Sequence, residues 1–257
     1  MSCGGFRRPG HTVRGNSPRY QRRFILRCAA RFLDGGSERN WIGTERVRGS
    51  SPPKCQEISL SDQFDIKKYP TFLGKVAQLS FVVRDFEEAL NFWTESLDVG
   101  PFVVMEDSLG DRPFIHRGKV SEVKMSLALA YLGDVQIELI CQLNSEPSPY
   151  AEFYARGSEG LQHVAFMPDD YDSTCRRLKT MGFEEVSYIL ASDGSKNASY
   201  YGSPHHIGTV FEITPMTPMR RMYLGAIKKL SEDWDGNKPV WRFATREDFL
   251  NSELCRV

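Results

Sequence analysis

The stretch VAQLSFVVRDFEEALNFWTESL, residues 76–97, combines a strand, a cap and a helix, and it decides the fold because the same plan returns later in the chain. Its first eight residues alternate as strand residues do, with successive side chains on opposite faces. Asp85 is a residue type that caps helices, and apolar residues then recur at helical spacing from Phe86 to Trp93. The stretch LQHVAFMPDDYDSTCRRLKTMGF, residues 161–183, follows the same plan. The chain therefore carries an internal duplication.

Three further strands are predicted after each helix. In the first copy they are residues 101–107, 123–132 and 134–141, and in the second copy they are residues 184–191, 197–201 and 207–214. A tight turn at Gly133-Asp134 joins the last two strands of the first copy. Each copy is thus a β-α-β-β-β unit. Two copies predict two modules that share an interior surface. A solenoid is not expected, because it would need more repeats.

The N-terminal segment differs in charge from the remainder of the chain. Residues 1–33 contain eight arginines and no acidic residue, which leaves 25 basic and 33 acidic side chains, a net charge of −8, in residues 34–257. An arginine-rich, serine-containing, acid-free segment is typical of a mitochondrial presequence, and equally of a disordered basic tail on a cytoplasmic protein. The acidic remainder would repel phosphates, which argues against a nucleic-acid partner.

Six segments describe the predicted domain organisation. They are a basic presequence-like or disordered tail (1–33), a polar linker (34–70), a first module (74–142), a connecting loop (143–160), a second module (161–215) and a C-terminal helix and tail (216–257). The longest apolar runs, such as residues 125–132, are far below the roughly 20 residues of a transmembrane helix, so no membrane span is predicted.

We expect deletion of residues 1–60 to leave the free energy of unfolding unchanged within about 1 kcal/mol, as for a terminus that packs on nothing. Thermal unfolding of the truncated and full chains measures this difference. A large loss of stability would identify the segment as a structural arm. An import assay with the first 40 residues fused to a reporter tests the mitochondrial prediction.

In four predicted strands one face is built mainly of apolar side chains, and the opposite face carries a metal-capable side chain. These side chains are Gln78 and Glu138 in the first module, and His163 and Glu212 in the second. Aligned strand to strand, Gln78 falls opposite His163. Taken singly, each residue is more often structural than catalytic. Their equivalent placement in the two copies favours a shared site.

These residues resemble those of the vicinal oxygen chelate superfamily, also called the glyoxalase, bleomycin-resistance and dioxygenase group. The resemblance covers about residues 74–215 and rests on the motifs QLSFVVRDFEEAL, QIELI, GLQHVAF and TVFEIT. It implies an α+β fold in which two β-α-β-β-β modules form a curled mixed sheet around a metal cleft, with a C-terminal helical extension. It also implies one divalent metal held by four ligands, which are Gln78, Glu138, His163 and Glu212.

The motifs point to a glyoxalase-like branch of this superfamily, related to lactoylglutathione lyase and methylmalonyl-CoA epimerase. The Gln, Glu, His, Glu set is similar to that of glyoxalase I enzymes, whereas methylmalonyl-CoA epimerases usually have His at the first position and Gln at the second. The stretches DVGPF (98–102) and WDGNKPVWRF (234–243) resemble an uncharacterised part of the branch. The resemblance therefore implies the fold more closely than the substrate.

The chemistry of the four residues can be argued from their atoms. One imidazole, one amide and two carboxylates form a mostly oxygen site that balances a divalent cation, so Zn, Ni, Co, Mn, Fe and Mg all remain candidates. A small-molecule substrate with two adjacent oxygens, or a thioester, could lose a proton next to its carbonyl, with Glu212 or Glu138 as the base. The predicted reaction is that of a glyoxalase-type lyase or an epimerase/isomerase.

Two other functions stay open. A non-catalytic protein that sequesters small molecules can have this fold, but such proteins typically lose the ligand set. An extradiol-type dioxygenase uses two histidines and one carboxylate, whereas only His163 is a histidine among the four positions. His116, His205 and His206 lie in loop-like segments and are expected to be solvated. The aromatic-rich stretch 146–160 fits a lid or an inert connector, and a homodimer stays open.

Overall fold

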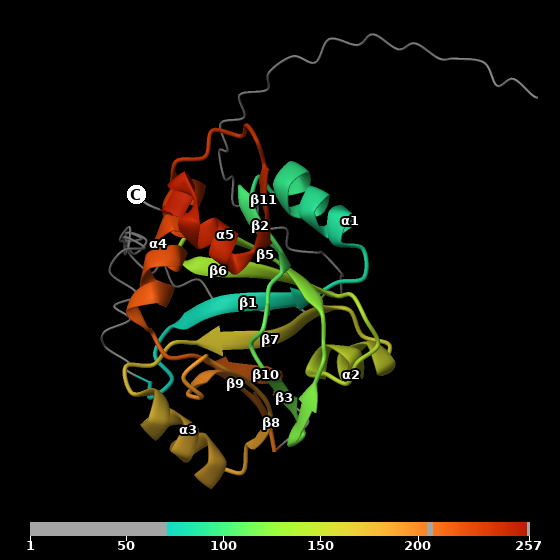
Figure 1. Cartoon of the computed structure of the whole chain (residues 1–257), viewed down its shortest axis with the longest axis vertical. Helices are drawn as coiled ribbons and strands as arrows, with labels where there is room; N and C mark the ends of the chain where they lie inside the picture. Colours follow the sequence, from blue (N-terminus) through green and yellow to red (C-terminus); the bar gives the residue numbers. More distant parts are fainter. Residues whose placement is uncertain (1–70, 205–207, 256–257) are drawn as a thin grey trace, which may run out of the picture. The chain divides into compact units, whose positions relative to one another are not determined.

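Strands β1 (Val76–Val82) and β7 (Gly160–Phe166) lie side by side, antiparallel, at the centre of a curled mixed sheet (Figure 1). The computed structural model describes residues 71–204 and 208–255. The predicted tail (1–33) and linker (34–70), like His205 and His206, lie outside these residues, and what was expected of them stays a prediction.

The two modules repeat one strand order outward from the centre. Beyond β1 come β6 (Val135–Gln142), β5 (Met125–Leu132) and β2 (Phe102–Asp107), and beyond β7 come β10 (Val210–Ile213), β9 (Lys196–Gly202) and β8 (Glu184–Leu190). In each module the first strand pairs in parallel with the last. Gly133 turns between β5 and β6 with φ of 59°. The predicted fold class, two β-α-β-β-β modules in one curled sheet, is confirmed.

Three strands extend this plan, so that the sheet has eleven strands within the described residues. A hairpin of β3 (Phe114–His116) and β4 (Lys119–Ser121) leaves the first module and pairs with β8 of the second. Strand β11 (Val240–Thr245) pairs in parallel with β2, so the C-terminal extension is not only helical. The hairpin strands have three residues each, which is too short to show a period in the sequence.

The predicted helices cover the outer face of the sheet. Helix α1 (Phe86–Asn91) is capped by Asp85 and continues as a π-helical turn, η3 (Phe92–Ser96). Helix α3 (Tyr171–Thr180) is capped in the same way by Asp170. Leu90 packs with Ile137 and Leu139, and Leu178 packs with Phe166 and Ile213. The apolar strand faces predicted from parity are the faces that these helices bury.

Other helices cover the inner face. Helix α4 (Pro218–Glu232), helix α5 (Arg246–Asn251) and the turn η4 (Glu253–Cys255) lie on one side of the sheet (Figure 1). Side chains of this extension pack in one cluster with inner-face residues of the first module; they include Leu224, Ile227, Phe249, Leu127, Leu129 and Ile140. Within the described residues, no helix has the length and apolar character needed to cross a bilayer.

The predicted connecting loop at 143–160 contains a helix, α2 (Pro149–Ala155). Ser148 accepts a hydrogen bond from the backbone N–H of Ala151, and proline suits the first helical position. Tyr150 is fully buried and packs with Tyr200 of β9. The connector is therefore part of the wall of the interior rather than a lid or an inert loop.

Candidate metal centre

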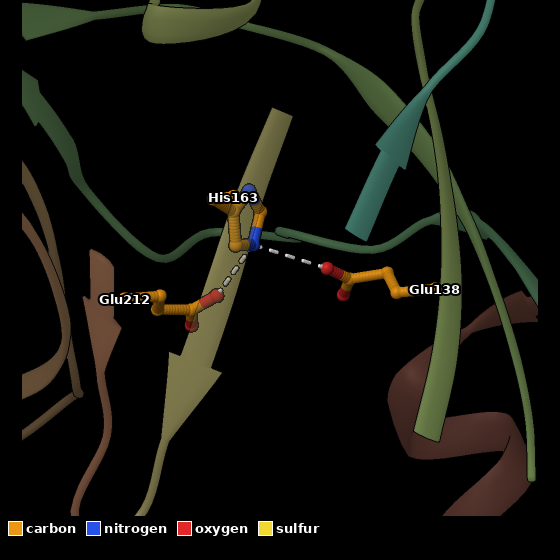
Figure 2. Close-up of side chains that lie close together, drawn as sticks. All are labelled: Glu138, His163 and Glu212. Carbon is orange, nitrogen blue, oxygen red and sulfur yellow. Dashed lines mark hydrogen bonds and ion pairs between the residues drawn. The ribbon is translucent and has the colours of Figure 1, made fainter. Parts of the chain in front are cut away.

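Glu138, His163 and Glu212 point toward one another from strands β6, β7 and β10 (Figure 2). His163 Nε2 lies 2.9 Å from Glu212 Oε2 and 3.4 Å from Glu138 Oε2. One ligand atom from each residue lies within 4.8 Å of the other two. All three side chains are buried, His163 completely. The structure thus brings together three of the four residues that the sequence singled out.

The duplication explains this convergence. Across β1 and β7, Gln78 pairs with Ala165 and Ser80 pairs with His163. Exchanging the two modules turns the pair of Gln78 and Ala165 into the pair of His163 and Ser80. Gln78 and His163 are therefore equivalent positions, as the strand alignment predicts. Ser80 is also opposite Glu138 in β6, just as Ala165 is opposite Glu212 in β10. The two glutamates are therefore equivalent as well.

Gln78 lines the same cavity as Glu138 and Glu212. Its Nε2 donates a hydrogen bond of 2.8 Å to Oε1 of Gln136, which is its partner in β6. The contact uses the amide nitrogen and leaves the amide oxygen of Gln78 out of this bond. That oxygen is the atom a cation would need, so a ligand role for Gln78 remains a proposal.

A neighbouring amide orients the His163 ring. Gln162 Oε1 lies 2.6 Å from Nδ1, and because a carbonyl oxygen only accepts, Nδ1 carries a proton. In the neutral ring the lone pair is then on Nε2, which faces the two carboxylates. A second hydrogen-bond partner of this kind fixes the tautomer of histidines that bind metals. The sequence contained no signal for the role of Gln162.

The two distances from His163 Nε2 to the carboxylates suit ligands of one divalent ion. Ligands about 2.1 Å from a metal lie roughly 3.0 Å apart along the edges of an octahedron and roughly 3.4 Å apart in a tetrahedron. The two His163 Nε2 to carboxylate distances are 2.9 and 3.4 Å. Burial of two carboxylates is costly unless a positive charge accompanies them. The group could therefore hold one divalent metal.

Without a metal, a proton on His163 can supply this charge. Burial lowers the pKa of His163, but the hydrogen bonds and charges of Glu138 and Glu212 outweigh it and raise the pKa to about 9. The proton and a metal compete for Nε2, because a metal needs the unprotonated nitrogen.

We therefore expect metal affinity to rise about tenfold for each pH unit from pH 7 to about 9, and then to level off. Competition with a chromophoric chelator at several pH values measures the affinity. Calorimetry in buffers of different ionisation enthalpy counts the released proton. A constant affinity across this range, with no proton released, would contradict the role of Nε2.

The equivalent glutamates differ in one contact. Ser80 Oγ donates a hydrogen bond of 2.5 Å to Glu138 Oε2. The residue that faces Glu212 in the same way is Ala165, which has no hydroxyl. Glu138 is thus held in place by its neighbour strand, whereas Glu212 lacks the corresponding donor.

Two tyrosines complete the wall beside the site. Tyr200 lies edge-on to the His163 ring, with centroids 5.4 Å apart, and its hydroxyl lies 3.3 Å from that of Tyr150. Burial raises the pKa of both phenols well above 10, so they add no negative charge. Tyr200 and Tyr150 line the cavity, which has a volume of about 60 Å³.

The expectation that His116 is solvated is wrong. His116 is buried in β3, with Nδ1 2.8 Å from Ser187 Oγ and Nε2 3.1 Å from Glu152 Oε1. The order serine, histidine, glutamate is that of a nucleophilic triad, but Ser187 is only 1% exposed, so no substrate reaches it. The three residues instead connect β3, β8 and α2.

Comparison with known proteins agrees with this architecture. Residues 77–199 match the model of the Glyoxalase/Bleomycin resistance protein/Dioxygenase superfamily. Over these residues the chain is similar to that superfamily. No curated protein matches the sequence significantly.

Several solved structures are similar to the chain. Methylmalonyl-CoA epimerase from Mycobacterium tuberculosis is 19% identical with a TM-score of 0.42, over 58% of this chain and 93% of that one. A hypothetical protein from Bacillus halodurans is 17% identical with a TM-score of 0.41, over 56% and 94% of the two chains. A variant of the Streptomyces coelicolor methylmalonyl-CoA epimerase, in complex with 2-nitronate-propionyl-CoA, is 14% identical with a TM-score of 0.38, over 56% and 95%.

Proposed function

We propose that the protein is a divalent-metal-dependent enzyme that removes and returns a proton at a carbon next to a carbonyl or thioester, in a lyase or isomerase reaction. The supporting observation is the buried Glu138, His163 and Glu212 group beside a cavity lined by both carboxylates. Within this group one imidazole and two carboxylates converge, which differs from the two histidines and one carboxylate of iron oxygenases.

The residues of the site would have two roles, metal binding and proton transfer. Gln78, Glu138, His163 and Glu212 would hold the metal, with Gln162 orienting the imidazole ring. Glu212 would in addition accept the substrate proton. A divalent ion, when bound, would supply positive charge that favours negative charge on a substrate oxygen. The buried walls, including Tyr150 and Tyr200, keep bulk water away from the reacting carbon.

Glu212 is the preferred base, with Glu138 as its equivalent in the other module. A carboxylate that accepts a substrate proton must be able to turn toward the substrate carbon. Ser80 holds Glu138 through a hydrogen bond of 2.5 Å, and Ala165 offers no such bond to Glu212. The difference between the modules thus favours Glu212 as the mobile carboxylate.

A binding protein without catalysis is the second candidate function. Sequestration of an apolar ligand would not require two buried carboxylates and an imidazole, which are costly to keep away from water. The buried polar group therefore favours the enzyme over the binder.

Deuterium exchange tests the proposed reaction. The metal-loaded protein is incubated in deuterated water with 2-oxo hemithioacetals, 2-substituted acyl-CoA thioesters and small 2-oxo acids, and exchange at the acidic carbon is followed. We expect exchange with at least one class. No exchange with any class, together with tight binding of an apolar ligand by metal-free protein, would favour sequestration.

A further inference from the structure

Three arginines line the cavity beside the candidate metal centre. Arg112 lies between β2 and β3, Arg220 lies in α4, and Arg246 begins α5. Arg220 is only 6% exposed. None of the ion pairs within residues 71–204 and 208–255 includes any of the three. The cavity is thus lined by positively charged side chains that are not paired with its carboxylates.

Neutral groups hold two of these guanidinium groups in position, those of Arg112 and Arg220. Arg112 donates to the backbone carbonyls of Leu109, at 3.0 Å, and Ser108. Arg220 donates to the carbonyl of Pro215 and to both oxygens of Asn197, at 3.0 and 2.9 Å. These acceptors orient Arg112 and Arg220 without neutralising them.

The positive charges act on one another and on Tyr223. Burial and the nearby charge of Arg246 lower the pKa of Arg112 to about 10. Burial raises the pKa of Tyr223, but the charges of Arg246, Arg220 and Arg112 outweigh it, so that this pKa is lowered. A potential of this sign favours an anion in the cavity.

Unpartnered polar atoms gather around the same cavity. Among the buried side-chain atoms of the described residues, three have no hydrogen-bond partner: Gln136 Nε2, Thr214 Oγ1 and Arg246 Nε. All three residues line this cavity. A buried polar atom without a partner costs about 1–3 kcal/mol, so native proteins seldom keep one without a reason. Two of the atoms, Gln136 Nε2 and Arg246 Nε, are N–H donors. A ligand with acceptor oxygens would satisfy them.

The arginines lie within reach of a small molecule bound at the metal centre. Thr214 follows Glu212 by two residues, which places it roughly 7 Å further along the chain. The carbonyl that Arg220 binds belongs to the next residue, Pro215. The cavity, about 60 Å³, is far below the roughly 300–1,000 Å³ of pockets that enclose drug-sized ligands.

We propose that the substrate is a small organic acid whose carboxylate binds Arg112, Arg220 and Arg246 while its reacting carbon faces Glu212. This assignment rests on the proposed function. A planar carboxylate matches the fork of a guanidinium group and needs less room than a phosphate. Arg220 and Arg246 belong to the C-terminal extension, outside the region that matches the superfamily model. The extension therefore supplies two of the three arginines of the anion site, and a free acid suits the cavity better than a CoA thioester.

Binding of propionate to the metal-free full chain tests the anion site without any reaction. Its apparent Kd is obtained from the concentration dependence of Tm, with sodium chloride to hold ionic strength constant. Arg246→Gln should bind propionate about 10- to 100-fold more weakly, because a charge-assisted hydrogen bond is lost. Arg221→Gln, an exposed arginine of the same charge in α4, is the matched control and should bind as the wild type does.

The stability of the free protein separates a ligand site from a structural one. Arg246→Gln removes a repelling charge, so its Tm without propionate should be equal to or above that of the wild type. A lower Tm with unchanged propionate affinity would overturn the proposal. Tighter binding of inorganic phosphate than propionate, or equal binding of the uncharged propionamide, would overturn the carboxylate assignment. Loss of metal binding or exchange would affect only the proposed function, because propionate binding is measured without metal.

Discussion

Replacement of Glu212 by glutamine should reduce proton exchange by about 10²- to 10⁴-fold, the usual contribution of a positioned general base. Glutamine has nearly the same shape as glutamate and keeps one oxygen, but it cannot accept a proton at neutral pH. Glu212 is buried at 7% exposure and faces the cavity, so the amide should occupy the same place. Exchange at the acidic carbon in deuterated water, measured under single-turnover conditions, gives the effect.

Two controls make this result specific. Glu122→Gln makes the same change at an exposed glutamate between β4 and β5 and should leave exchange unchanged. Metal content should be compared at the same time, because loss of the metal would also stop exchange. Undiminished exchange in metal-loaded Glu212→Gln would remove Glu212 from the base role.

Replacement of His163 by alanine should lower the free energy of unfolding of the metal-free protein by about 3–5 kcal/mol near pH 6. Removal of one partner from a buried charged group leaves the remaining charges uncompensated, and this is where the cost arises. Glu138 and Glu212 lie 3.4 and 2.9 Å from His163 Nε2 and would then face each other without a cation. Chemical unfolding of both proteins measures the difference.

The pH dependence identifies the cause of this loss. The folded-state pKa of His163, about 9, is above its ordinary value of 6.5, so its charge contributes fully below about pH 6.5 and progressively less up to pH 9. The difference between wild type and His163→Ala should therefore shrink over this interval. Gln78→Ala removes an uncharged side chain from the same cavity, and its effect should not change with pH there. A pH-independent loss in His163→Ala would indicate a packing defect.

The sequence predicted the duplicated part of the fold because local signals there agree with the tertiary structure. Alternation along β1, β6, β7 and β10 placed the polar residues on one face, and Asp85 and Asp170 marked the helix starts. Comparison of the two copies then selected the candidate ligands. Pairing partners such as Ser80 and Ala165, which distinguish the two glutamates, depend on strand register, which no local pattern specifies.

Features outside the duplication could not be found in this way. The hairpin of β3 and β4 pairs with a strand of the other module, and β11 pairs with β2 across more than a hundred residues. Arg112, Arg220 and Arg246 have no counterpart in the repeat, so no comparison of the copies could select them. They line one cavity because α4 and α5 pack on the inner face of the sheet.

Metal content of the purified protein is the most direct test of the central claim. The full chain, purified without chelators and then dialysed against mixed divalent metals, should retain one equivalent per chain by elemental analysis. Glu138→Gln combined with His163→Gln should retain none, while Glu122→Gln should retain one. Equal metal retention by the double variant, or no retention by the wild type under any of these conditions, would contradict a metal centre built from Gln78, Glu138, His163 and Glu212.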